Sequence, residues 1–424
     1  FTVLNTAGGD RGDLPNAPLP KYLADFPYVN GGLFADDILS PSFSIKSRRM
    51  LIECGSELDW SDINPDIFGS MIQAVVHPDQ RGGMGMHYTS VTNIMRVIEP
   101  LFLNDLYEEL EKVESSEAKL QKLQQRLGEI KIFDPACGSG NFLIIAYKEL
   151  RKLEMDVLKR LQELEAKRTG GQISQPFSMI KLSQFYGIEL DDFAHEVAIL
   201  SLWLAEHQMN VEFKVEFGEA LPSLPLKRSG NVVVGNATRV DWDSVCPSQN
   251  NEYIFILGNP PYYGARFQDN AQKEDMSLSM PEVPSRNNLD YISCWFYLAA
   301  NYIENNPNAQ FAFVSTNSIT QGQQVSKLWP YVLRDKLDIR FAHTSFKWTN
   351  NAKNQAAVIC VIIGVANSYE GEKYLYGEGH VRKAKEINPY LACAKTIYVN
   401  DRRAPLSTLP IMSFGSMAND GGHL

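Results

Sequence analysis

The spacing of hydrophobic residues predicts helices along the first part of the chain. Apolar residues at every fourth position predict a helix over 58–76, and a second helix is expected to begin near Thr89. Two further apolar stripes at helical spacing cover 106–127 and 150–164. Both stripes are short, so we expect them to pack against other helices of this protein rather than to form a coiled coil with a partner.

Strands and helices alternate through the rest of the chain. Short apolar runs predict strands at 131–134, 185–189, 211–217, 232–237, 254–258, 310–315, 339–343 and 357–365. Helical patterns predict helices at 141–168, 191–208, 289–305 and 321–336. This alternation indicates an α/β fold with a parallel sheet wound right-handedly. Residues 264–287 are polar and show no period, so we expect a long loop that acts as a lid or a binding loop.

Composition narrows the class of protein. With 44% hydrophobic and 21% charged residues among 424, the chain fits a soluble globular protein of two or three domains. Its longest apolar runs, such as 356–365, are too short to span a bilayer as a helix. Six scattered cysteines show no metal-ligand spacing, and no signal peptide opens the chain, which predicts a reduced, cytoplasmic compartment. The first residue is Phe1 rather than Met, so we expect the true N-terminus upstream.

The net charge of −10 argues against a protein that coats nucleic acid, because neutralising phosphates requires clustered Lys and Arg. Overall charge describes the whole surface and leaves open a basic surface confined to one region, for which Lys46, Arg48 and Arg49 are candidates.

The segment Asp134-Pro-Ala-Cys-Gly-Ser-Gly140 lies between a predicted strand and a predicted apolar helix. Its glycines let the backbone approach a ligand closely, and the helix start offers free N–H groups. The third glycine of a dinucleotide-binding loop is absent, since Asn141 and Phe142 follow, and the Gly-Lys-Ser/Thr of a P-loop is absent as well.

Two further strands end in polar residues. Glu189 ends the strand 185–189 and is suited to accept hydrogen bonds from both ribose hydroxyls of a nucleoside, while Asp191 is expected to cap the next helix. At the end of the strand 232–237, Asn236 and, shortly beyond it, Asp241 are alternative polar candidates for contact with a ligand, and we favour Asn236.

The segment Asn259-Pro-Pro-Tyr262 follows the strand 254–258. The prolines fix the backbone, so that the Asn259 amide and the Pro260 carbonyl point the same way. Two acceptors aimed at one amino group bind both of its N–H donors and turn the nitrogen lone pair outward. Tyr262 then offers a flat face on which an extruded base can stack.

These motifs, in this order after Gly85-Met-His-Tyr-Thr-Ser90, resemble the gamma class of N6-adenine DNA methyltransferases. More narrowly, segments at 28–34, 59–69 and 149–154 resemble the bifunctional MmeI-like restriction–modification enzymes, which join nuclease, helical spacer, methyltransferase and target-recognition domains in one chain. The resemblance implies a class I S-adenosylmethionine-dependent methyltransferase fold, with a Rossmann-like, seven-stranded mixed sheet and helices on both faces. It divides the chain into a spacer region (1–80), a catalytic domain (81–400) and the start of a junction to a recognition domain (401–424).

The resemblance also implies roles for single residues and requires no metal for methylation. It assigns binding of S-adenosylmethionine to Tyr88, Thr89, Asp134, Ala136, Cys137, Gly138, Gly140, Glu189, Asn236 and Ala237. It assigns binding and orientation of the reacting amine to Asn259, Pro260, Pro261 and Tyr262. The substrate implied is an adenine flipped out of double-stranded DNA, stacked on Tyr262 with either Phe346 or Trp348 on its other face.

Other interpretations remain open. Asn-Pro-Pro-Tyr also serves methylation of RNA and of protein glutamine, and a cofactor- or DNA-binding module of a larger defence complex is a non-enzymatic alternative. Glu212-Phe-Lys214 fits the last part of a nuclease motif but lies within the predicted methyltransferase core. We therefore expect nuclease and target-recognition domains elsewhere on the full-length chain. The 424-residue chain is expected to bind S-adenosylmethionine but to methylate DNA weakly or not at all.

Overall fold

A computed structural model describes residues 12–14, 18–21, 42–57, 89–218, 231–249, 251–347, 359–377 and 379–400. The helix expected over 58–76, the candidate residues Tyr88 and Trp348, and the junction at 401–424 lie outside these residues. Among the described residues, no helix has the length and apolar character needed to cross a membrane.

A single mixed sheet of nine strands forms the centre of the described fold, in the order β3-β2-β1-β4-β5-β7-β6-β8-β9. The strands are β1 (Lys131–Asp134), β2 (Phe185–Glu189), β3 (Asn231–Val234), β4 (Ile254–Gly258), β5 (Ala309–Thr316), β6 (Leu337–Lys347), β7 (Ile359–Asn367), β8 (Lys373–Gly377) and β9 (His380–Ala384). Strands β1 to β5 pair in parallel, whereas β7 is antiparallel to both of its neighbours. The predicted fold class is confirmed, although β8 and β9 extend the expected seven strands by two.

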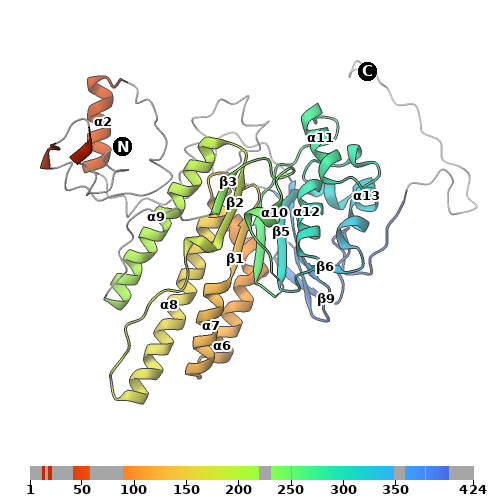
Figure 1. Ribbon diagram of the computed structural model, residues 1–424. Coiled ribbons are helices and arrows are strands. Elements are labelled where there is room, and N and C mark those ends of the chain that lie inside the picture. Colours follow the sequence, from red (N-terminus) through yellow and green to blue (C-terminus); the bar gives the residue numbers. More distant parts are fainter. Residues whose placement is uncertain are drawn as a thin grey trace, which may run out of the picture.

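Helices cover both faces of this sheet (Figure 1). One core contains residues of α5 (Val91–Ile98), a π-helical turn (Glu99–Leu103), α6 (Asn104–Val113), α7 (Glu117–Glu129), α8 (Asn141–Thr169) and α9 (Asp192–Phe217). The other core contains residues of α10 (Trp242–Val245), α11 (Asn270–Ser279), α12 (Ser293–Ile303) and α13 (Gly322–Leu333). A further helix, α2 (Ile45–Ser56), is exposed along its whole length. The two predicted leucine stripes pack within the protein, as expected, since α7 and α8 lie against each other.

Residues 211–217 form the last two turns of α9, so the strand predicted there is wrong. Their apolar and polar residues alternate as in a strand. The helix that begins at Asp192 nevertheless continues through them and ends at Gly218, which has φ of 83°. Adding a residue to an existing helix is favourable, whereas a new strand would need a partner. Phe213 is buried and packs on Phe217 with ring centroids 4.6 Å apart.

Residues 264–287 contain α11, so the long loop predicted there is also wrong. Asp269 accepts a hydrogen bond from the backbone N–H of Gln272, and Gln272 accepts one from the backbone N–H of Asp269. This reciprocal capping starts the helix. Met276 and Met280, four residues apart, are fully buried in the second core and hold α11 against the domain.

The tips of β1 and β4 lie side by side at the carboxyl edge of the sheet. Gly258, the last residue of β4, has φ of +156°, and a Cβ atom there would lie 2.6 Å from Asp134 Oδ1. A side chain at position 258 would therefore clash with the carboxylate that ends β1. This close approach places Asn259, the next residue, beside the glycine-rich segment that follows β1.

We expect Gly258→Ala to lower the free energy of unfolding by about 1–3 kcal/mol, because the new methyl group meets Asp134 and the backbone conformation is strained. Gly264→Ala is the matched control, since a Cβ atom there approaches nothing closer than 3.8 Å. Urea unfolding of both variants checks this. Equal stability of the two would contradict the close packing of the strand tips.

Candidate active site

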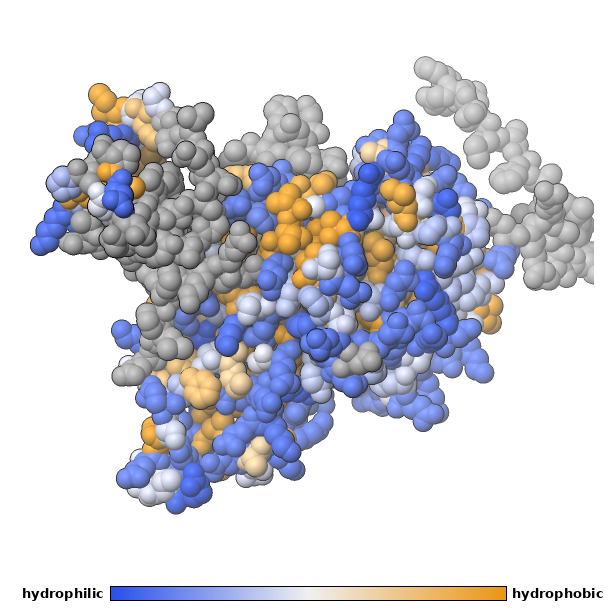
Figure 2. All heavy atoms as spheres, in the orientation of Figure 1, coloured by the Kyte–Doolittle hydropathy of each residue, from blue (hydrophilic) through white to orange (hydrophobic). Residues whose placement is uncertain are grey.

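A cavity of about 290 Å³ opens at the carboxyl edge of the sheet. Four predicted segments meet in its wall: Ala136 and Gly138 after β1, Glu189 at the end of β2, Asn236 and Ala237 after β3, and Asn259 and Pro261 after β4. On the face drawn in Figure 2, apolar side chains gather between β3 and α11, and the cavity wall includes apolar residues such as Ile188 and Leu190. The cavity therefore combines apolar walls with convergent polar groups, as small-molecule sites do.

The glycine-rich segment turns tightly from β1 into α8. Gly140 has φ of +83° and caps the start of α8, and a Cβ atom there would lie 3.2 Å from Ala198 of α9. The Cys137 sulfur packs toward β2, where a Cβ on Gly187 would approach it to 2.9 Å. Cys137 and Gly140 therefore pack against neighbouring elements and do not line the cavity, whereas Ala136 and Gly138 line it.

Two backbone N–H groups hold the Glu189 carboxylate. Gly138 N–H donates to its Oε2 over 2.7 Å and Asp191 N–H donates to its Oε1 over 2.9 Å. Burial raises the pKa of Glu189 above its ordinary value, and these hydrogen bonds oppose the shift. Each carboxylate oxygen keeps a second lone pair, so this group can accept further hydrogen bonds in the cavity. Asp191 caps α9 by accepting from Ala194 N–H, as predicted.

Asp134 lies beneath the cavity rather than in its wall. Its side chain is buried and accepts a hydrogen bond from Ala136 N–H over 3.0 Å. Burial raises the pKa of Asp134 to about 8, and repulsion from Glu189 adds to the shift. This carboxyl therefore holds the first turn of the glycine-rich segment and packs against Gly258.

Of the two candidates after β3, the structure places Asn236 in the cavity wall. Its Nδ2 donates to Asp275 Oδ2 over 3.0 Å, and its Oδ1 accepts from the N–H and the hydroxyl of Thr238. Asp241 is exposed and caps α10, where it accepts from Asp243 N–H over 3.2 Å.

Asn259 is placed differently, because the oxygen of its amide is buried and has no hydrogen-bond partner within the described part of the chain. Its Nδ2 lies 3.4 Å from the Oγ1 of Thr89, a buried residue just before α5. A buried acceptor without a partner costs about 1–3 kcal/mol, so such atoms are rare in folded proteins. The oxygen can therefore accept a hydrogen bond from a further donor.

The aromatic candidates converge on β7. The hydroxyl of the half-buried Tyr262 forms a hydrogen bond with the Cys360 thiol, and burial raises the pKa of both groups, to about 12 for Cys360. Phe346 lies directly opposite Cys360 in the pairing of β6 with β7. The Arg96 guanidinium covers the Phe346 ring at 4.7 Å from its centroid.

The motifs did not identify the wall that α11 and α12 contribute. Gln272 and Asp275 of α11 line the cavity together with Asp269, which caps that helix, and Trp295 of α12 lines it together with Tyr291, two residues before that helix. The indole of Trp295 also donates to the Pro135 carbonyl over 3.2 Å. A signal existed in the sequence: Asp269 and Gln272 have capping-box spacing, and the apolar pair 276 and 280 follows them.

Asp290, next to Tyr291, supports the backbone just after the Asn-Pro-Pro-Tyr turn. Its buried carboxyl accepts from Tyr263 N–H over 2.8 Å, and burial raises the pKa of this group.

Comparisons with known proteins agree on one family. The family described as MmeI, DNA-methyltransferase domain, matches residues 110–377. The chain is similar to DNA methyltransferase A of Bacillus subtilis (strain 168), with 51% identity over 408 residues, covering 96% of this chain and 46% of that protein. It is also similar to the solved structure of the Type IIL restriction–modification enzyme MmeI in complex with DNA, with 42% identity and a TM-score of 0.88 over 100% of this chain and 56% of that one. The chain spans about half of the length of these relatives.

The raised pKa of Asp134 predicts how stability depends on pH. The ordinary value of 3.8 applies to the unfolded chain and about 8 to the folded chain, so the folded state binds the proton more tightly. The free energy of unfolding should therefore fall as the pH rises from about 4 to about 8. Asp134→Asn keeps an oxygen that accepts from Ala136 N–H, but its side chain does not ionise, so the variant does not lose stability at this site as the pH rises. We expect its melting temperature to exceed that of the wild type increasingly between about pH 5 and about pH 8.5, and a gap that does not change with pH would contradict the assignment.

Proposed function

The chain belongs to the MmeI DNA-methyltransferase family, and we propose that it transfers a methyl group from S-adenosylmethionine to N6 of an adenine in double-stranded DNA. The sequence motifs predicted this family, and its match covers 110–377. Adenine as the target base is inferred from the Asn259-Pro-Pro-Tyr262 segment and its surroundings.

The amide oxygen of Asn259, which has no hydrogen-bond partner among the described residues, carries the proposal. An exocyclic amine presents two N–H donors, and its lone pair is delocalised into the base. The Asn259 oxygen and the Pro260 carbonyl are two acceptors for these donors. As the nitrogen becomes tetrahedral, its N–H bonds gain positive character, so hydrogen bonds to both acceptors strengthen in the transition state. The Thr89 Oγ1 lies 3.4 Å from the Asn259 Nδ2, on the other side of the amide from the oxygen that would bind the substrate.

The cavity fits the methyl donor. S-adenosylmethionine supplies a methyl group on a positively charged sulfur, which is an electrophile without any metal. Glu189 would accept from its ribose hydroxyls with the lone pairs that Gly138 and Asp191 leave unused. Asn236 and Ala237 would border its adenine ring, and Ala136 and Gly138 would lie along its length. Thr89 and the first backbone amides of α5 would contact its carboxylate.

The target adenine must leave the stacked duplex to reach Asn259. Tyr262 would stack on one face of it, held by the contact between its hydroxyl and Cys360. Phe346 is the candidate for the other face, since it lies opposite Cys360; Trp348 is its alternative from the sequence. We further propose that the chain acts in restriction–modification, as the name of the solved relative states for that enzyme. Recognition of a DNA sequence and its cleavage would then use domains present in such longer relatives.

Asn259→Ala tests the mechanism. We expect it to lower methyl transfer by at least about 100-fold, because it removes an acceptor that strengthens in the transition state. The affinity for S-adenosylmethionine, measured by calorimetry, should change by less than about 3-fold, because the substitution acts on the amine rather than on the cofactor. The control Asn308→Ala removes an amide far from the cavity, at the amino end of β5.

Mass spectrometry of digested DNA identifies the product. N6-methyladenine is expected, and a different methylated base, or label found only in RNA or protein, would replace the proposal with one of its alternatives. If Asn259→Ala forms N6-methyladenine at the wild-type rate, the proposed mechanism is wrong although the proposed reaction stands. Transfer can be measured on the 424-residue chain and on a longer chain in which it is joined to a target-recognition domain.

A further inference from the structure

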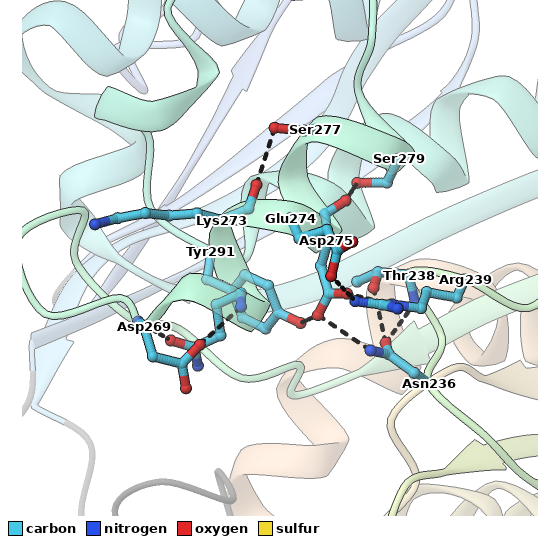
Figure 3. Close-up of polar contacts among 11 residues, drawn as sticks. Asn236, Thr238, Arg239, Asp269, Lys273, Glu274, Asp275, Ser277, Ser279 and Tyr291 are labelled. Carbon is cyan, nitrogen blue, oxygen red and sulfur yellow. Dashed lines mark hydrogen bonds and ion pairs between the residues drawn. The ribbon is translucent and has the colours of Figure 1, made fainter.

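The buried carboxylate of Asp275 connects three elements at the wall of the cavity. It extends from α11 and is 3% exposed. Its Oδ2 accepts from Asn236 Nδ2 over 3.0 Å and from the Tyr291 hydroxyl over 2.7 Å, and its Oδ1 accepts from Arg239 Nε over 2.5 Å. Figure 3 shows the side chains of Asn236, Arg239 and Tyr291 converging on it. No motif in the sequence pointed to this residue.

The contacts of Asn236 allow only one orientation of its amide. Asp275 can only accept, and the backbone N–H of Thr238, 3.0 Å from Asn236 Oδ1, can only donate. Rotating the amide by 180° would set its oxygen against the Asp275 carboxylate and its NH₂ group against the Thr238 N–H. Oxygen and nitrogen of an amide have nearly the same shape, so these charges, not packing, decide which atom faces where.

Arg239 contributes to this cluster from the surface. It is about half exposed and also pairs with Glu274 over 3.0 Å. Exposed ion pairs stabilise little, so the interior contacts of Asp275 with Asn236 and Tyr291 carry the connection between α11 and the end of β3. Glu274, one position away on the same helix, has no part in the contacts of Asn236 within the described structure.

We propose that Asp275 is a positioning residue for recognition of the nucleobase of S-adenosylmethionine, acting by holding the Asn236 amide in one orientation. This inference rests on the proposed function, because it takes the cavity as the cofactor site. The hydrogen-bonding pattern that Asn236 presents to an adenine ring is then set by α11, a helix outside the glycine-rich segment and the strand tips. Asp275 itself need not touch the cofactor.

The test uses Asp275→Asn in the 424-residue chain. An asparagine at 275 can donate as well as accept, so it permits both orientations of the Asn236 amide. We measure binding of S-adenosylhomocysteine and of its inosine counterpart, which differs only at the base, by calorimetry. We expect Asp275→Asn to reduce the preference between the two ligands by about 5-fold or more, a size typical of one misplaced hydrogen bond. Glu274→Gln, the same carboxyl-to-amide change one residue away, should leave both affinities within about 2-fold.

A reciprocal exchange separates positioning from stability. In the double variant Asn236→Asp/Asp275→Asn, the new Asn donates to the new Asp, which still accepts from Thr238, but position 236 then has no N–H left for the ligand. We expect this variant to keep a melting temperature near that of the wild type but to lose the wild-type preference between the two ligands, and thermal unfolding without ligand reports whether each variant is folded. If Asp275→Asn does not fold, Asp275 acts on stability and this inference is overturned.

The outcomes distinguish the two proposals. Equal weakening of both ligands in Asp275→Asn would reduce Asp275 to a structural residue and overturn this inference. An unchanged preference in Asp275→Asn would overturn it as well. If the expected pattern is found but the methylated product is not N6-methyladenine in DNA, this inference stands and the proposed reaction fails. A wild-type chain that binds neither ligand would overturn both.

Discussion

The contact between Asp134 and Gly258 is the constraint on which the candidate site depends. Parallel pairing of β1 with β4 aligns their carboxyl ends, and the missing side chain at 258 lets the carboxyl of Asp134 fill the space between them. The turn after β1 and the turn after β4 therefore open into the same cavity. A donor bound by the first turn can then reach an amine held by the second, which is the proximity that methyl transfer requires.

Two asparagines at this edge of the sheet are in opposite states, and the difference indicates different roles. The amide of Asn236 is hydrogen-bonded on both sides, by Asp275 and by Thr238. That of Asn259 has Thr89 on one side only, and its oxygen is buried without a partner in the described structure. An amide held on both sides has a fixed orientation, whereas an unpaired acceptor is costly until a substrate supplies the donor. We interpret the first as recognition and the second as catalysis.

The α11 region shows how local patterns were misread. Few apolar residues between 264 and 287 suggested a loop, yet two methionines and one capping pair are sufficient for a helix once a core is present to bury them. At 211–217 the reverse happened, since residues with strand-like alternation continue helix α9 up to Phe217. Both errors arise because the stability of a short element comes mostly from what it packs against, which its own residues do not specify.

The sequence by itself determined the α/β class, most strand positions and the segments after β1, β2 and β4, because each depends on neighbouring residues: a strand, a turn with Gly or Pro, a helix start. The family followed from the same segments. Only the tertiary structure decided that Asn236 rather than Asp241 borders the cavity, that Cys137 faces β2, and that Asp275 joins the wall. Asp275 and Asn236 are 39 positions apart, and their hydrogen bond exists only because two elements fold against each other. Spacing along a chain contains no information about such a contact.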